Sequence, residues 1–176
     1  VIYPRCFKGD IRKIYAQGEV FLEVAHDKKH PFIVESDDFK LQVLGTKFNI
    51  SNYKGGTTNI VLVEGAVEVT DKNEKKARLN PNDLLNIANG TIAYQKQVDV
   101  AEYISWVEGI MLLNGNDLSQ IIQRLSIYYG ISIQCDPIIG KEKVYGKLDL
   151  KDDIDEVIEC IQQTLPFTIE KSDTSI

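Results

Sequence analysis

The sequence predicts a mainly β protein that ends in a small α+β module. Three observations carry this prediction. The N-terminal part breaks into short strand-like runs separated by turn residues, the C-terminal part contains a repeated helical pattern, and the charge balance differs between the two. We expect an all-β domain, sandwich or solenoid-like, over residues 1–98, a helical connector over 99–109 and a βαβ-βαβ module over 110–176.

Turn signals in the first part divide it into strands. Residues 18–25 and 32–34 are apolar runs separated by a polar stretch that ends at Pro31. Gly45-Thr46 interrupts the alternation of the next run, as a β-bulge would. Asn89-Gly90, between two apolar runs, is a strong signal for a two-residue hairpin turn. Because no stretch here keeps a 3.6-residue period, we expect β structure throughout.

Residues 100–107 predict a short helix between the two parts. Val100, Tyr103, Ile104 and Val107 fall on one helical face, and Gly109 is placed to end the helix in a left-handed conformation. We expect Trp106, together with Tyr103, to pack at the junction between the two domains.

The second part contains an internal repeat with a shift of 36 residues. The shift places apolar residues on apolar residues at helical spacing: Leu118 on Ile154, Ile121 on Val157, Ile122 on Ile158 and Leu125 on Ile161. Asp117 and Asp153 each precede a Gln or Glu by three residues, the spacing of a capping box. Strands at 110–113 and 144–150 are expected before the helices and further strands after them, so that both helices cover one side of a small mixed sheet.

Composition excludes several classes of protein. The net charge is −6, with 14 Lys/Arg against 13 Asp/Glu in residues 1–100 and 6 against 13 in residues 101–176. No basic stripe suited to nucleic acid is present, and the longest strongly apolar run, residues 60–63, is far too short to span a membrane. The start has neither Met nor a signal sequence, so we expect a soluble piece of a longer protein. Three cysteines, Cys6, Cys135 and Cys160, lack CxxC spacing and are expected to be buried free thiols, although one disulfide between any pair is arithmetically open.

Side chains for catalysis, a cofactor or a metal are not apparent. His26 and His30 lie four apart, but Pro31 and neighbouring lysines favour a surface turn over a metal site. The acidic run at residues 152–159 lacks calcium-loop spacing and suits the positive end of a helix dipole. We therefore expect a binding or signal-relay module rather than an enzyme.

Several motifs resemble one known family. Five segments together resemble the periplasmic region of FecR-type anti-sigma factors. They are residues 18–27 with 31–34, Val43-Leu44-Gly45-Thr46-Lys47-Phe48-Asn49-Ile50, Val61-Leu62-Val63-Glu64-Gly65-Ala66-Val67-Glu68-Val69, the turn at 79–83, and Trp106-Val107-Glu108-Gly109. Asn82 stands where that family usually has Gly. The motif sequences are most similar to those of family members from Bacteroidetes. Residues 110–176 are similar to the STN-type signalling domain of secretins and TonB-dependent receptors.

The resemblance implies a periplasmic sensor that contacts the N-terminal signalling domain of a TonB-dependent outer-membrane transducer and controls release of an extracytoplasmic-function sigma factor. The sigma factor would be bound only by a cytoplasmic segment outside this chain, and the parent protein would have one inner-membrane helix, also outside it. The alternatives are direct sensing of a glycan or metal chelate by the β domain, and an enzyme on a β scaffold. An edge of the C-terminal sheet is the expected partner site, with these candidate residues: Ile110, Leu112, Val144, Tyr145, Lys147, Phe167 and Ile169.

Overall fold

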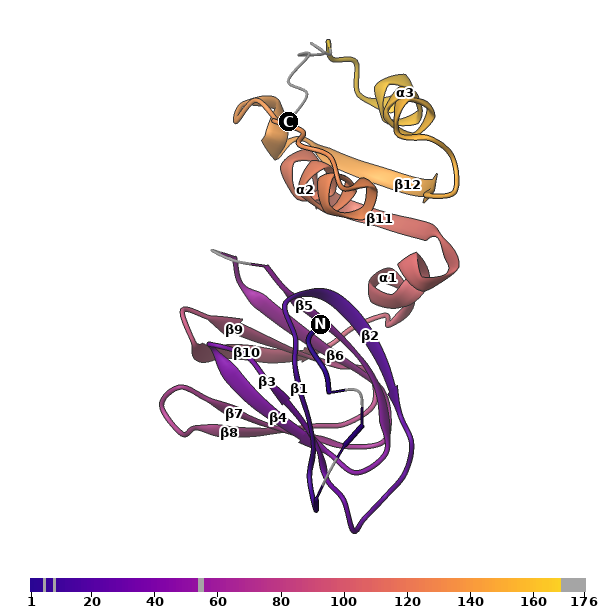
Figure 1. The fold of residues 1–176 in the computed structure, drawn as a ribbon. Coiled ribbons are helices and arrows are strands. Elements are labelled where there is room, and N and C mark those ends of the chain that lie inside the picture. The colour runs from indigo at the N-terminus through magenta and orange to yellow at the C-terminus, as the bar shows by residue number, and fades with distance from the viewer. Residues whose placement is uncertain (5, 8, 54–55, 169–176) are drawn as a thin grey trace. The chain divides into compact units, whose positions relative to one another are not determined.

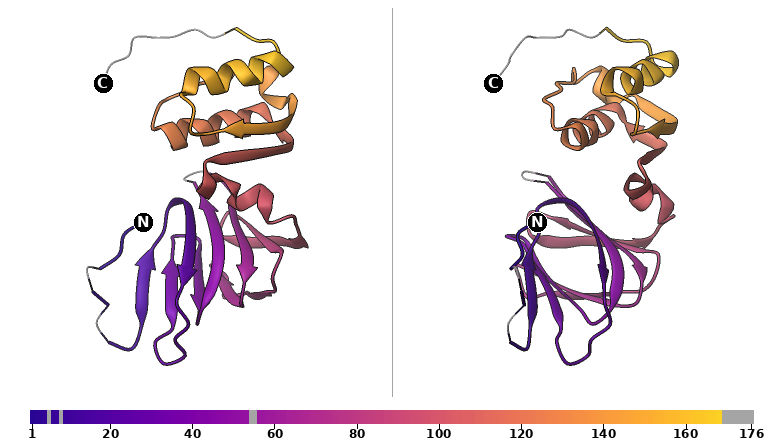
Figure 2. Two further views of the ribbon diagram at one scale, coloured as in Figure 1. Left: turned by 90° about the vertical axis from the view of Figure 1, so that its right-hand side faces the viewer. Right: turned by 45° about the vertical axis from the view of Figure 1, so that its right-hand side comes forward.

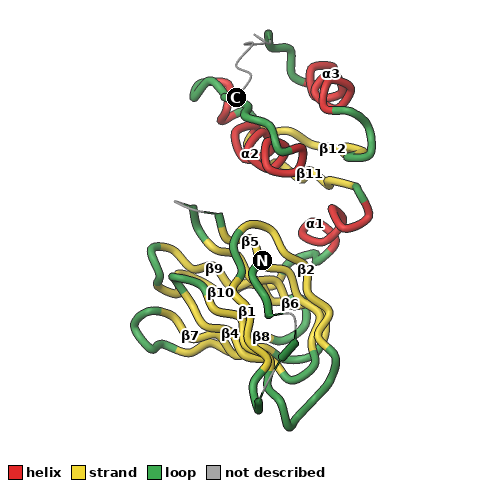
Figure 3. The backbone as a smooth tube through the Cα atoms, viewed as in Figure 1, coloured by secondary structure: helices red, strands yellow, loops and turns green. Residues whose placement is uncertain are grey.

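The computed structural model describes residues 1–4, 6–7, 9–53 and 56–168. The chain divides into two compact units, Val1–Ile104 and Ser105–Ile176. The division falls inside the predicted connector. Strands dominate the first unit and helices are prominent in the second (Figures 1 and 3).

The first unit contains ten strands among its described residues. Each is short and bounded by turn residues, as the sequence predicts: β1 (Arg12–Tyr15), β2 (Gly18–Val24), β3 (Phe32–Glu35), β4 (Phe39–Val43), β5 (Thr46–Asn52), β6 (Thr58–Glu64), β7 (Val67–Asp71), β8 (Lys76–Leu79), β9 (Asp83–Ala88) and β10 (Thr91–Gln97).

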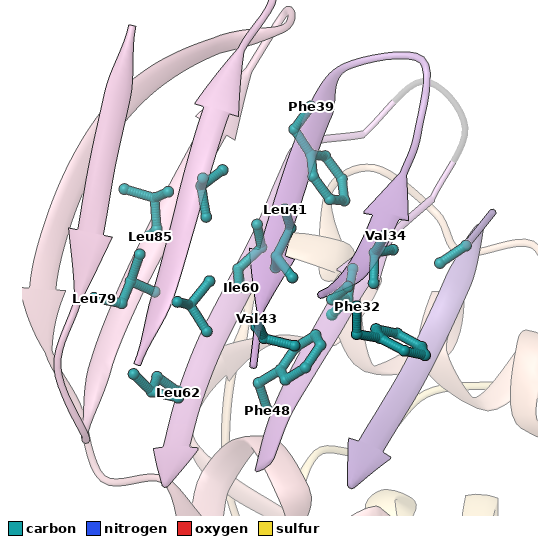
Figure 4. Close-up of a cluster of buried hydrophobic side chains, with 14 of the residues drawn as sticks. Phe32, Val34, Phe39, Leu41, Val43, Phe48, Ile60, Leu62, Leu79 and Leu85 are labelled. Atoms are coloured by element: carbon teal, nitrogen blue, oxygen red, sulfur yellow. The ribbon is translucent and has the colours of Figure 1, made fainter. Parts of the chain in front are cut away.

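These strands form two five-stranded sheets that share one core. The first sheet has the order β1-β3-β4-β7-β8 and the second the order β10-β9-β6-β5-β2. All pairings are antiparallel except that of β1 with β3. Alternate residues of both sheets point into a single hydrophobic cluster, seen in Figure 4 between the strands, where Leu41 and Val43 of the first sheet meet Phe48 and Ile60 of the second. The unit is therefore a β-sandwich, one of the two architectures expected.

Of two predictions made from turn residues, the hairpin at Asn89-Gly90 is correct and the β-bulge at Gly45-Thr46 is wrong. Asn89 and Gly90 adopt φ values of 52° and 73° and join β9 to β10, which confirms the predicted hairpin. The predicted bulge at Gly45-Thr46 is instead the point where the chain leaves β4 of the first sheet and enters β5 of the second.

The structure has helix where residues 100–107 predict it. The helical segment consists of α1 (Ala101–Ile104), which belongs to the first unit, and the 3-10 helix η1 (Ser105–Glu108), which belongs to the second. Gly109 follows with φ 80°, and its N–H donates to the Trp106 carbonyl at 3.0 Å. Gly109 therefore terminates the helix as predicted.

The second unit continues through β11 (Ile110–Asp117), α2 (Leu118–Tyr129), the 3-10 helix η2 (Ile139–Lys141), β12 (Lys143–Asp149) and α3 (Ile154–Thr164). Figure 2 shows the two helices and the two strands of this unit from further sides. The helices begin 36 residues apart, and the apolar residues aligned by the repeat pack in one core together with Met111, Leu113 and Leu148. None of the helices in the described ranges has the length and hydropathy needed to cross a bilayer.

The two predicted helix caps differ. The Asp153 carboxylate accepts the Glu156 N–H at 3.0 Å, as expected for an N-cap. Asp117 makes no such bond, and its carboxylate lies 2.8 Å from Lys143 Nζ. The first helix start is thus tied to β12 rather than capped by its own Asp.

The βαβ-βαβ prediction is wrong in part. Residues 131–136 form no strand, and the N–H groups of Ile131 and Ile133 donate to the carbonyl and hydroxyl of Ser126 at the end of α2. Phe167 lies outside any strand, and Ile169 lies outside the described residues. The sheet of this unit, as far as it is described, is the antiparallel pair β11–β12 and not a mixed sheet.

Candidate functional site

The candidate partner site is the β11–β12 pair, and its two faces differ. Met111 and Leu113 of β11, with Val144 and Leu148 of β12, are buried in the core with the helices. The residues that alternate with them lie on the opposite face of the pair, away from the helices: Ile110, Leu112, Tyr145 and Lys147. Of these four residues, Leu112 and Lys147 are directly opposite each other, while Ile110 is opposite Asp149 and Tyr145 is opposite Asn114. Val144, expected at an edge, is instead a core residue at 4% exposure.

The same four residues turn their backbone groups outward. The Leu150 N–H donates to the Gly109 carbonyl at 2.7 Å, which makes this position a hydrogen-bonded pair. Bonded and non-bonded pairs alternate along an antiparallel ladder. Ile110, Leu112, Tyr145 and Lys147 are therefore at non-bonded positions, with N–H and C=O groups pointing away from the partner strand. These four residues stay candidates for a partner-binding edge.

The β11 edge is interrupted beyond Leu112. The Asn114 N–H is bound by the Asn116 side chain at 2.9 Å, and the register shifts between these two residues. Gly115 sits in this bulge with φ 75°, and a Cβ there would lie 2.9 Å from the Tyr145 hydroxyl. The Tyr145 ring thus reaches across the pair to the bulge. The sequence signal that could have revealed this feature is Asn114-Gly115-Asn116, a turn-like triplet within the expected strand.

The two lysines at one end and in the middle of β12 differ in their ion pairing. Lys143 pairs with Asp117, whereas Lys147 is in no ion pair among the described residues. Tyr145, Gly146 and Lys147 are consecutive exposed positions, with Tyr145 at 64% exposure. The middle of β12 therefore offers an uncommitted cation and an aromatic ring to solvent.

The two residues expected at the domain junction belong to different units. Trp106 is partly buried and packs against the core of the second unit, while Tyr103 is a half-buried residue of α1 in the first. Packing between the units by this pair stays a prediction. Phe167 packs on the same core as Trp106 and is not at an open edge.

In the first unit, three of the motifs quoted above meet at one corner of the sandwich. A Cβ on Gly45 would lie 2.5 Å from the His26 Cα, and one on Gly65 would lie 2.8 Å from the Gly45 carbonyl oxygen. The Asp27 N–H donates to the Leu44 carbonyl at 2.7 Å, and the Thr46 hydroxyl donates to the Ala66 carbonyl at 3.1 Å. The motif glycines therefore allow three connections to pack with their backbones in contact.

The two histidines lie in the turn of this corner. The Asp27 carboxylate accepts from the N–H groups of Lys29 and His30 and lies 2.7 Å from His30 Nδ1. The hydrogen bond with His30 is the main reason that the pKa of Asp27 is lowered. Throughout the described ranges, no three His, Cys, Asp or Glu side chains gather as a metal site.

The cysteines are unbonded thiols, but their burial was predicted incorrectly. Cys6 and Cys160 are exposed and Cys135 is half-buried. Burial is the main cause of a raised pKa for the Cys135 thiol, which disfavours the reactive thiolate.

A polar groove of about 420 Å³ crosses the outer face of the first sheet, over β3, β4 and β7. Its lining is mostly charged, and several of the charges pair locally: Lys76 lies 2.9 Å from Glu68, and Lys72 lies 2.7 Å from Asp38 beside the groove. Lys40 is the lining lysine for which no ion pair occurs among the described residues. The groove suits a polar ligand better than an apolar one.

Comparison with known proteins points in one direction. A family described as FecR protein matches residues 7–68, and one described as FecR, C-terminal, matches residues 110–176. The crystal structure of a candidate anti-sigma factor from Parabacteroides distasonis ATCC 8503 at 1.65 Å is similar, with 30% identity and a TM-score of 0.83 over 98% of this chain and 82% of that chain. A second structure of that description, at 2.50 Å, has 30% identity and a TM-score of 0.81 over 98% and 81%. No curated protein matches the chain.

Proposed function

This chain belongs to the FecR family of anti-sigma factors, and on that premise we propose that it is the periplasmic sensor portion of a transmembrane anti-sigma factor. The family has a regulatory and not an enzymatic role, that of controlling a sigma factor. In the proposal, the first unit is the FecR domain, residues 99–109 are the connector and the second unit is an STN-like signalling module. Trp106 and Tyr103 would hold the domains together at the connector.

The signal would come from a TonB-dependent outer-membrane transducer whose own N-terminal signalling domain contacts the second unit. The observation that carries this proposal is the β11–β12 pair, in which each strand pairs with the other on one side and, among the described residues, with no strand on its other side. Edges of this kind bind partner strands through main-chain hydrogen bonds. Contact here would change release of the sigma factor, which the cytoplasmic part of the parent protein would bind.

The charge of the second part supports a protein partner of complementary sign. Residues 101–176 carry 6 basic and 13 acidic residues, so electrostatic attraction would raise the association rate with a basic surface. The same balance disfavours nucleic acid, whose phosphates need a basic face.

Direct sensing of a small ligand is the second candidate, and the groove on the first sheet favours it. Its lining of lysines, carboxylates and Thr70 could hydrogen bond a glycan. In this case the first unit and not the second would receive the signal.

Calorimetry on the full chain distinguishes the two candidates. We expect the signalling domain of the transducer encoded beside this gene to bind in the micromolar range or tighter. A matched chain carrying Lys40→Ala in the groove should bind it with the same affinity. A folded transducer domain that gives no heat of binding, together with a glycan that binds the chain but not its Lys40→Ala variant, would overturn the receptor-contact proposal.

A further inference from the structure

The two edges of the β11–β12 pair are not equivalent. On β11 the outward positions are Ile110 and Leu112, both half-buried, and the next outward N–H, that of Asn114, is already bound by Asn116. A strand arriving on that side would have only two residues to pair with before it met the bulge. The β11 edge is therefore poorly suited to accept a partner.

On the β12 edge, no side chain among the described residues binds the N–H of Tyr145, Lys147 or Asp149. These three outward positions are all exposed. Gly146, in the middle of the strand, has φ 136°, and its backbone groups face β11, so it is not one of the outward positions. β12 is hydrogen-bonded to β11 on one side, and on its other side no strand pairs with it among the described residues. Three successive outward residues are enough for a short added strand.

Resting on the function proposed above, we infer that the β12 edge is the surface that binds the transducer, and that it accepts an extended segment as a third strand. The side chains of β12 define the chemistry of that segment. An acidic residue would face Lys147, whose charge has no ion-pair partner among the described residues, and an apolar residue would face Tyr145. Beyond them, Asp149 and the nearby Asp152 favour a basic residue in the incoming strand.

Proline substitution provides a matched test, because Leu112 and Lys147 are directly opposite each other. Both N–H groups point away from the pair, so proline at either position removes no hydrogen bond within the β11–β12 ladder. Lys147→Pro removes an outward donor from β12, and Leu112→Pro removes the equivalent donor from β11. Both variants would be made in the full chain, and their folding would be checked by circular dichroism.

With the isolated signalling domain of the neighbouring transducer as the probe, we expect Lys147→Pro to weaken binding by about tenfold or more and Leu112→Pro to change it by less than about twofold. Hydrogen exchange should show new protection of the Tyr145 and Lys147 amides on binding. Should Lys147→Pro not fold, Lys147→Glu should weaken binding by about tenfold at low salt, with a smaller effect as salt is raised.

The results separate the two proposals. If the unaltered chain binds but Lys147→Pro or Lys147→Glu binds equally well, or if protection appears at Ile110 and Leu112 instead, the β12 edge is not the binding surface, while the proposed function stands. If the unaltered chain does not bind a folded transducer domain, both proposals fall.

Discussion

Gly45 gives the sharpest test of how the FecR motif shapes the sandwich. Alanine at this position would place a Cβ 2.5 Å from the His26 Cα and 2.6 Å from His26 Nδ1, contacts that only a shift of the backbone can relieve. Overpacking of this kind costs about 1–3 kcal/mol. The shift would also strain the 2.7 Å hydrogen bond from Asp27 to the Leu44 carbonyl, worth about 1 kcal/mol. We expect Gly45→Ala to destabilise the first unit by about 2–4 kcal/mol.

The matched control is Gly56→Ala in the same unit. The nearest atom to a Cβ there is the Tyr53 carbonyl oxygen at 3.3 Å, and φ lies outside the left-handed region. This contact needs a shift of only a few tenths of an ångström, so the change should cost less than about 1 kcal/mol.

Thermal unfolding can follow the two units separately. The chain has one tryptophan, Trp106, and it belongs to the second unit, so its fluorescence follows that unit. The β-sheet component of the infrared amide I band follows mainly the β-sandwich, which contains ten of the described strands. Gly45→Ala should lower the melting temperature of the β signal by roughly 10–20 °C and move the tryptophan transition much less. Equal melting temperatures for Gly45→Ala and Gly56→Ala would refute the steric argument.

Three further outcomes are expected. Trp106→Ala should destabilise the second unit by about 2–3 kcal/mol in urea unfolding, because a partly buried ring leaves its core; an unchanged midpoint would contradict that packing. Asp153→Ala should cost about 1 kcal/mol through the lost cap of α3, and Asp117→Ala, which loses an exposed ion pair, less than that; the reverse order would be unexpected. Hydrogen bonds, first of all that from the Ile92 N–H, lower the pKa of Asp71 in the folded state. The carboxylate therefore stabilises the fold above the pKa that Asp71 has in the unfolded chain, and this stabilisation is lost as the pH falls below about 4. Asp71→Asn should therefore reduce the acid sensitivity of the sandwich in a pH series of melting curves, and an unchanged pH profile would count against this role.

Features that depend on neighbouring residues could be predicted from the sequence. The Asn89-Gly90 hairpin and the Gly109 helix end are set by backbone conformations that those residues favour, and the 36-residue repeat locates both helices. Pairing between distant strands was not predictable in the same way. Residues 131–136 have the alternation of a strand, but two of their N–H groups are bound by Ser126 at the end of α2.

The candidate site also depends on strand pairing that the sequence does not reveal. Ile110, Leu112, Tyr145 and Lys147 could be proposed as edge residues from their place in expected strands, yet the period of two gives no register between strands. The register of β11 with β12 decides that Leu112 faces Lys147 and that Val144 turns into the core. It also creates the bulge at Gly115, which makes the two edges unequal.

The chain enters β11 and leaves β12 at the same end of the two-stranded ladder, and this has a mechanical consequence. β11 begins at Ile110 and β12 ends at Asp149, and these two residues are opposite each other at one end of the ladder. Tension applied between the connector and α3 would therefore pull both strands apart from the same end and break the hydrogen bonds one after another, as a zipper opens. Strands loaded from opposite ends would resist in shear, with all the bonds bearing the load together. The ladder itself would therefore open at a lower force in this direction than under shear.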